Sequence, residues 1–153
     1  MARLDKSQMK RRVTMACERF LKNDGYLLER DANERSITHK FAEHLQSEFR
    51  HWHVDCEYNR DEHRTKQLVL PRRESFPEED GHARTVFPDI IVHRRGTRDN
   101  LLVIEAKKSS NPDGDDWDRE KLTEFKTQLG YRFALFVRFL TREGHGEPEL
   151  EWI

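Results

Sequence analysis

The feature that most constrains this chain is a pair of apolar segments joined by a short polar turn. Residues 87–95 (FPDIIVHRR) and 101–108 (LLVIEAKK) are separated by residues 96–100, which begin with Gly96. Apolar stretches of this length, rich in Ile and Val and bounded by turn residues, are typical of β-strands. The sequence therefore predicts a β-hairpin whose strands are largely covered by other parts of the protein.

Three charged residues interrupt the apolar pattern at the open end of this hairpin. Asp89 begins the first strand, whereas Glu105 and Lys107 end the second. Glu105 and Lys107 project to the same face because they are two positions apart. With a turn centred on residue 98, Asp89 is expected opposite Lys107. The same register places Ile91 opposite Glu105, so all three charged side chains share one face.

Charged groups at the end of a buried strand need a compensating interaction. An unpaired buried charge costs several kcal/mol, and two neighbouring carboxylates also repel each other. A divalent cation removes that repulsion. Oxygen ligands on a rigid sheet suit Mg²⁺, which keeps several waters and takes only one or two carboxylates. Such an ion activates water and neutralises charge on a phosphoryl group, which leaves Lys107 to orient or deprotonate the attacking water.

The other elements are predicted from the spacing of apolar residues. Helical periodicity over residues 8–23 and about 32–50 predicts two helices, the first capped by Ser7 and ended by Gly25. Alternation over residues 53–59 predicts a half-buried strand. After the hairpin, the pattern predicts three further elements: a helix at about 116–129, a covered strand at 131–140 and a short edge strand at 148–153.

This order of elements predicts a single α/β domain, residues 1–153, with a mixed central β-sheet flanked by helices. The chain has 153 residues, 35% of them hydrophobic and 37% charged, which allows one compact core beneath a charged surface. Long apolar runs are absent from the sequence, and the charged N-terminus does not resemble a secretory signal. We therefore expect a cytoplasmic protein that does not enter the membrane, with Cys17 and Cys56 reduced.

The hairpin residues resemble the PD-(D/E)xK nuclease superfamily, whose members have a restriction endonuclease-like core. The match consists of Pro88-Asp89 at the start of one strand and Glu105-Ala106-Lys107 at the end of the next. The order of elements over about residues 32–140 also agrees. The resemblance implies that Asp89, Glu105 and the Ala106 carbonyl bind the metal and that Lys107 is the catalytic lysine. It further implies an endonuclease or exonuclease that uses Mg²⁺ or Mn²⁺ to hydrolyse phosphodiester bonds in nucleic acid.

Glu34 is predicted to join this site from the second helix. At about 100° per residue, it lies at the centre of a stripe of four apolar residues that begins with Ile37. The pattern Asp31-x-x-Glu34 also fits a capping box, in which the Glu closes the helix terminus. A cap has no need to lie on the apolar stripe, and the superfamily commonly places a Glu on this helix beside the metal. We therefore predict Glu34 as a catalytic residue and a metal ligand.

The substrate class follows from the resemblance, with DNA favoured over RNA, and a homodimer would enlarge the contact surface. The formal net charge of -1 gives no general attraction to nucleic acid, so binding needs a local basic surface. Three short basic runs are interpreted as solvated faces: Lys10-Arg11-Arg12, Arg72-Arg73 and Arg94-Arg95. Any sequence preference is assigned to the polar segment 60–86 and to flanking basic residues. Trp52 and Trp117 are interpreted as core residues rather than stacking platforms.

Two other classes of function remain open. A nucleic-acid-binding or regulatory module could retain the nuclease fold without catalysis, although the intact Asp89, Glu105 and Lys107 argue against it. A protein-interaction domain fits the nearly neutral charge but leaves the half-buried acids unexplained. Turnover distinguishes the nuclease from the first alternative, and metal binding distinguishes it from the second.

Several further residues have a weaker claim to the site. Glu57 could approach the acids from the first strand, and Gln128 lies in the last helix, where some relatives carry a polar residue. The aspartates of residues 113–118 lack the spacing of a calcium loop and are interpreted as helix caps. The histidines of residues 39–63 lack zinc-finger spacing.

Overall fold

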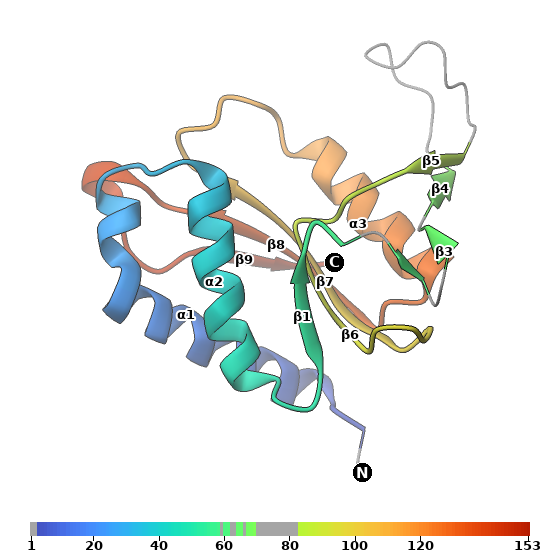
Figure 1. The fold of residues 1–153 in the computed structure, drawn as a ribbon. Coiled ribbons are helices and arrows are strands. Elements are labelled where there is room, and N and C mark those ends of the chain that lie inside the picture. Colours follow the sequence, from blue (N-terminus) through green and yellow to red (C-terminus); the bar gives the residue numbers. More distant parts are fainter. Residues whose placement is uncertain (1–2, 59, 62–63, 66, 70–82) are drawn as a thin grey trace.

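The computed structural model describes residues 3–58, 60–61, 64–65, 67–69 and 83–153 (Figure 1). Its central sheet has five strands: β1 (His53–Cys56), β6 (Ile90–His93), β7 (Asn100–Lys108), β8 (Phe133–Phe139) and β9 (Glu149–Trp152). The strands are ordered β1-β6-β7-β8-β9; β7 and β8 are parallel, and the other neighbours are antiparallel. The predicted α/β class with a mixed sheet is therefore confirmed.

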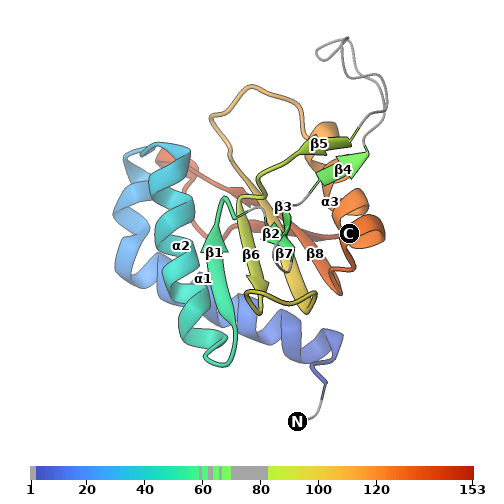
Figure 2. The same ribbon diagram turned by 45° about the vertical axis from the view of Figure 1, so that its right-hand side comes forward.

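In the described part of the chain, three α-helices flank this sheet: α1 (Lys6–Glu29), α2 (Glu34–Glu48) and α3 (Asp116–Leu129). Figures 1 and 2 show α1 and α2 on one face and α3 on the other. A short 3-10 helix (Arg142–Gly144) connects β8 to β9. None of the helices in the described ranges is long and apolar enough to cross a membrane.

The first helix begins earlier and ends later than its sequence predicts. Asp5, not Ser7, is the N-cap, and it forms a capping box with Gln8. Gly25 lies inside α1 rather than beyond its end, and the irregular backbone of Asp24 marks a kink there. A glycine inside a helix is unfavourable but tolerated when tertiary packing holds the helix on both sides.

Alternate residues of β6 and β7 pack into two separate cores. Ile90 and Ile104 face α1 and α2, in a core that includes an edge-to-face contact between the Phe20 and Phe41 rings. Ile91 and Val103 face α3 in the smaller core. Both strands are buried throughout, as expected for a sheet that is covered on both faces. Glu105 and Lys107 continue the alternation of Val103 and therefore lie on the α3 face.

The register of the hairpin differs from the predicted one by two residues. Ile91 pairs with Val103 rather than Glu105, and continuing this register places Asp89 across from Glu105 rather than Lys107. The turn is centred between residues 96 and 97 rather than on residue 98, because His93 pairs with Asn100. An irregularity between Val92 and His93 then moves the pairing back by one residue, and residue counting along the sequence cannot detect it. A shift of two residues preserves the face, so Asp89, Glu105 and Lys107 still share one side of the sheet.

The polar segment 60–86 forms two short antiparallel ladders within its described residues. The first pairs β2 (Arg60–Asp61) with β3 (Arg64–Thr65), and the second pairs β4 (Gln67–Val69) with β5 (Ala83–Thr85). The β4–β5 ladder lies beside α3 (Figure 2). The basic run Arg72-Arg73 lies outside the described residues.

Candidate active site

Asp89 lies immediately before β6, at the open end of the hairpin. Its Oδ2 atom accepts a hydrogen bond from the main-chain N–H of Ala106 at 2.8 Å, which joins the two strands beyond their last ladder pair. Burial raises the pKa of Asp89 above its ordinary value, and the negative charge of Glu34 contributes, although the Ala106 N–H opposes the shift. Asp89 is therefore a half-buried carboxylate whose ionised form lacks full compensation.

Glu105 is more deeply buried, with 2% of its surface exposed. Burial and the neighbouring charge of Asp89 raise its pKa well above the ordinary value. Its Oε1 atom has no hydrogen-bond partner among the described residues, whereas its Oε2 atom lies 3.4 Å from Nζ of Lys121. A buried carboxylate oxygen without a partner is costly, and a bound cation is one of the few groups that can compensate it.

Lys107 shares this face of β7, but its ammonium group is bound elsewhere. Nζ donates to Oδ2 of Asp118 at 2.6 Å and to the carbonyl oxygen of Gly114 at 2.8 Å. Asp118 was expected to serve as a helix cap. In the structure it is a buried partner of Lys107, while the N-cap residue Asp115 makes no side-chain capping bond. Asp115 instead forms an ion pair with Arg138.

Among the described residues, Lys121 on α3 has the ammonium group nearest the carboxylate pair, and no sequence motif singled it out. Its Nζ atom lies near Glu105 and 3.8 Å from Oδ1 of Asp118. Burial lowers its pKa, but the charges of Glu105, Asp118 and Asp89 outweigh burial and raise it. A sequence signal existed, because Asp118 and Lys121 lie one helical turn before the buried Leu122 and Phe125.

Glu34 is the first residue of α2 and does not form the capping box that was the alternative to a role in the site. Asn33 is the cap, with Oδ1 accepting from the main-chain N–H of Ser36 at 2.8 Å. Oε2 of Glu34 accepts from the main-chain N–H of Lys108 at 3.2 Å and from Nδ2 of Asn111 at 3.1 Å. The side chain therefore reaches the end of β7 instead of closing its own helix.

These side chains line one cleft with a volume of about 690 Å³. Glu34 lies at the end of β7, Asp89 and Glu105 lie on the sheet, and Lys107 and Lys121 lie towards α3. Trp117, expected in the core, packs against the smaller core and also lines the cleft. Within the described ranges, no three His, Cys, Asp or Glu side chains are grouped closely enough to hold a metal ion. The cleft thus presents a carboxylate pair with Glu34 nearby.

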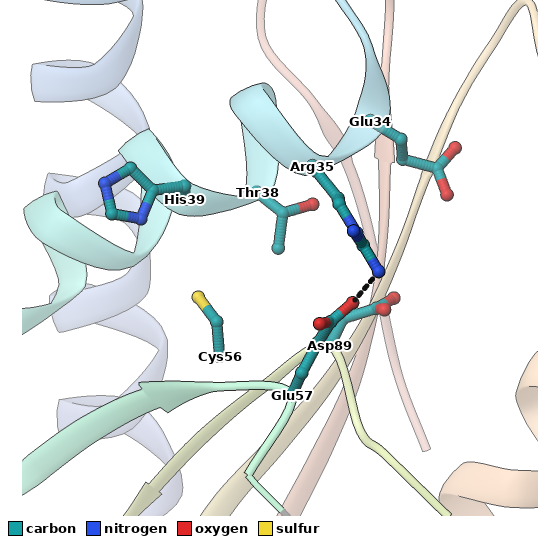
Figure 3. A pocket seen from close by; sticks show the side chains of 7 residues that line it. All are labelled: Glu34, Arg35, Thr38, His39, Cys56, Glu57 and Asp89. Atoms are coloured by element: carbon teal, nitrogen blue, oxygen red, sulfur yellow. Dashed lines mark ion pairs between the residues drawn. The ribbon is translucent and has the colours of Figure 1, made fainter.

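A smaller pocket of about 350 Å³ adjoins Asp89 and Glu34 on the α2 side (Figure 3). Glu57 was expected on the polar face of the first strand, but β1 ends at Cys56. Glu57 has a left-handed backbone with φ of 53°, and its N–H points at the carbonyl oxygens of Pro88 and Asp89, 3.1 and 3.2 Å away. Arg35 reaches across the pocket to pair with Glu57 at 3.3 Å.

One candidate from the sequence lies away from the cleft, and the smaller pocket contains a thiol. Gln128 lies near the end of α3, is exposed and binds Glu124 rather than lining the cleft. Cys56 lines the smaller pocket, but burial raises the pKa of its thiol to about 11. The thiol is therefore protonated at neutral pH and is a poor nucleophile.

Comparison of the chain with protein-family models, with curated proteins and with solved structures finds no match. The resemblance to PD-(D/E)xK nucleases therefore remains a prediction from the hairpin residues. The site is defined by its own geometry: the half-buried Asp89 and the buried Glu105 on one sheet face, with Lys107 on the same face and Lys121 on α3.

The raised pKa of Glu105 predicts how the metal-free protein responds to pH. A carboxyl whose pKa is raised on folding favours the folded state when protonated, so stability falls as pH rises above its ordinary value of about 4.5. Glu105→Gln removes this ionisation. In EDTA, the variant should melt a few degrees above wild type at pH 8, with the difference shrinking towards pH 5. The exposed Glu143→Gln serves as a control that melts like wild type throughout. A constant difference across this pH range would contradict the prediction.

Proposed function

We propose that this protein is a metal-dependent nuclease of the PD-(D/E)xK type, which hydrolyses phosphodiester bonds in nucleic acid, and we favour DNA over RNA as its substrate. The observation that carries the proposal is the buried pair Asp89 and Glu105, in which one Glu105 oxygen lacks a partner. The arrangement of elements supports a restriction endonuclease-like core, because the paired acids lie at the open end of a hairpin and α3 connects parallel strands. Catalysis of this kind requires no further prosthetic group.

The residues present suit a hard divalent cation such as Mg²⁺ or Mn²⁺. Asp89 and Glu105 would hold it, with the carbonyl of Ala106 and the nearby Glu34 completing the protein's contribution. Two carboxylates suffice for Mg²⁺, which retains several waters, so the proposal does not require a three-carboxylate cluster. When bound, the cation supplies Lewis-acid stabilisation of the negative charge that develops on the phosphoryl oxygens.

The two lysines contribute positive charge on opposite sides of Asp118. Lys107 carries the role implied by the motif: it orients the attacking water and stabilises developing charge. Asp118 is its positioning residue, since it receives the ammonium group at 2.6 Å. Lys121 neutralises part of the charge on Glu105 and so lowers the free-energy cost of burying the acid pair before the cation binds.

The carboxylates and Lys107 should have separable effects on cleavage and on metal binding. Asp89→Ala and Glu105→Ala each remove a ligand, so Mg²⁺-dependent cleavage should be abolished and cation binding weakened. Lys107→Met keeps most of the bulk but removes the charge, so kcat should fall at least about 100-fold with cation binding largely retained. The measurements are cleavage of plasmid, single-stranded DNA and RNA with Mg²⁺, Mn²⁺ or EDTA, and calorimetric cation binding.

Two outcomes would contradict this assignment. A folded Lys107→Met protein that cleaves at the wild-type rate refutes the role of the lysine. Wild-type protein that binds nucleic acid but cleaves none of these substrates with either metal refutes the nuclease. That second outcome favours the non-catalytic, nucleic-acid-binding alternative.

Lys121→Met tests whether this ammonium group competes with the cation. Removing a positive charge beside Glu105 should strengthen Mn²⁺ or Mg²⁺ binding by roughly one order of magnitude and lower the stability of the protein in EDTA. Lys126→Met is the matched control, because Lys126 lies on the same helix and donates to the carbonyl of Ile153 instead. Calorimetry and thermal melts with and without metal measure both effects. Weaker cation binding in Lys121→Met would show that Lys121 supports the bound ion instead.

Glu34→Ala separates a site role from a structural one. The change removes two hydrogen bonds, so the protein should lose about 1–3 kcal/mol of stability in urea unfolding. Asn33→Ala is the matched control, since it removes the adjacent helix cap at a cost of about 1 kcal/mol without changing the cleft. Cation affinity should fall in Glu34→Ala alone. Equal affinity in the two variants would assign Glu34 a purely structural role.

A further inference from the structure

A cavity of about 480 Å³ lies at the other end of the sheet from Asp89 and Glu105. Arg94 and Asp99, on the β6–β7 turn, line it together with Trp52 from the α2–β1 connection. Figure 2 shows that turn at the lower end of the sheet and the loop after β7 at the upper end. Five residues of β7 lie between the turn and Glu105, so the two sites are at least about 17 Å apart.

Positive charge dominates the lining of this cavity. Its charged groups are four arginines (Arg3, Arg12, Arg94 and Arg132) and the single carboxylate of Asp99. Asp99 forms an ion pair with Arg94 and lies 3.9 Å from Arg132, so one acid is shared between two guanidinium groups. Burial lowers the pKa of Arg132, and the neighbouring Arg3 and Arg94 add to the shift. The cavity therefore has more positive charge than its own residues neutralise.

Aromatic rings contact three of these arginines and order their side chains. The guanidinium carbon of Arg94 lies 3.8 Å from the centre of the Trp52 ring, and that of Arg132 lies 5.6 Å from the same centre. Arg12 packs over Phe49 at 5.5 Å and donates to the main-chain carbonyl of Glu48. A guanidinium group stacked on a ring keeps its N–H donors available at its edge, and ordering it in advance lowers the entropic cost of binding.

We propose that this cavity binds a phosphate group of a nucleic-acid strand and anchors the strand at a distance from the cleavage site. The identity of the strand rests on the proposed nuclease function, whereas the phosphate chemistry rests on the arginines themselves. Guanidinium groups match phosphate oxygens in a bidentate manner, and each neutralised phosphate releases counterions. Arg12 and Arg94, expected to lie on solvated faces, supply the local basic surface that a chain of net charge -1 needs.

The test compares two double variants with the same loss of charge. Arg94→Ala/Arg132→Ala removes two arginines of the cavity, and Lys22→Ala/Arg30→Ala removes two exposed cations elsewhere. Binding of labelled single- and double-stranded DNA is measured by fluorescence anisotropy in EDTA, so that cleavage plays no part. Oligonucleotides of about 20 nucleotides are long enough to span both sites. We expect the cavity variant to bind at least about tenfold more weakly, with the slope of log Kd against log salt reduced by about one.

Loss of folding is controlled separately, because Arg94 also pairs with Asp99 and packs on Trp52. Thermal melts must show the double variant folded. The single variant Arg132→Lys keeps the charge without the guanidinium fork, so it should bind with intermediate affinity. If the double variant does not fold, wild-type affinity in Arg132→Lys and in Arg3→Ala overturns the proposal.

Each outcome separates this inference from the proposed function. Equal affinity of the cavity variant and its control overturns the anchor, even if both cleave DNA with Mg²⁺. Weak binding by the cavity variant supports the anchor, and wild-type protein that then fails to cleave overturns the nuclease alone. Titration with inorganic phosphate and a free nucleotide completes the test. Wild-type protein that binds these through Arg94 and Arg132 but binds no oligonucleotide overturns the assignment to a nucleic-acid strand.

Discussion

The burial of Glu105 beside Asp89 is the constraint to which the rest of the site responds. Neither acid can be ionised there without a compensating positive charge, because burial raises both pKa values and a neighbouring carboxylate adds to each shift, Glu34 for Asp89 and Asp89 for Glu105. Compensation comes from α3 through an alternating series of charges: Glu105 contacts Lys121, Lys121 contacts Asp118, and Asp118 binds Lys107. The series returns to β7 and fixes the start of α3 against the sheet. Packing and electrostatics of the site are therefore coupled.

The net charge of the chain is nearly zero, but positive and negative side chains are separated along its central strand, β7. Carboxylates cluster at the end of β7 near Glu105, whereas arginines cluster beside the β6–β7 turn. Fields from such separated groups act over about a Debye length, roughly 8–10 Å, so each end attracts ligands independently of the total. An acidic end suits a divalent cation, and a basic end suits a phosphate. Net charge is consequently a poor guide to the partners of this protein.

Sequence patterns predicted the elements well because their cause is local. The helix at 116–129 has those bounds, and the face shared by Asp89, Glu105 and Lys107 follows from strand alternation. What could not be predicted depends on contacts between distant segments. The pairing of Asp89 with Glu105 required the irregularity near His93, and the approach of Lys121 to Glu105 required the docking of α3. Trp52, expected in the core, is partly buried and packs against it, and its stacking with Arg94 depends on the fold.

Lys107 and Lys121 show that a sequence motif predicts the face on which a side chain lies better than it predicts the groups that the side chain contacts. Lys107 is two residues from Glu105 and must share its face, yet strand spacing says nothing of the group that its ammonium binds. That group is Asp118, and the lysine beside Glu105 comes from the next turn of the same helix. An ammonium group held by a carboxylate at 2.6 Å is ordered, but it is also restrained. Lys121, at 3.4 Å from its acid, is held less closely. In the proposed nuclease, the ordered Lys107 suits the fixed geometry of a transition state. The less restrained Lys121 suits an acid pair whose positive partner changes from an ammonium group to a metal cation when the cation binds.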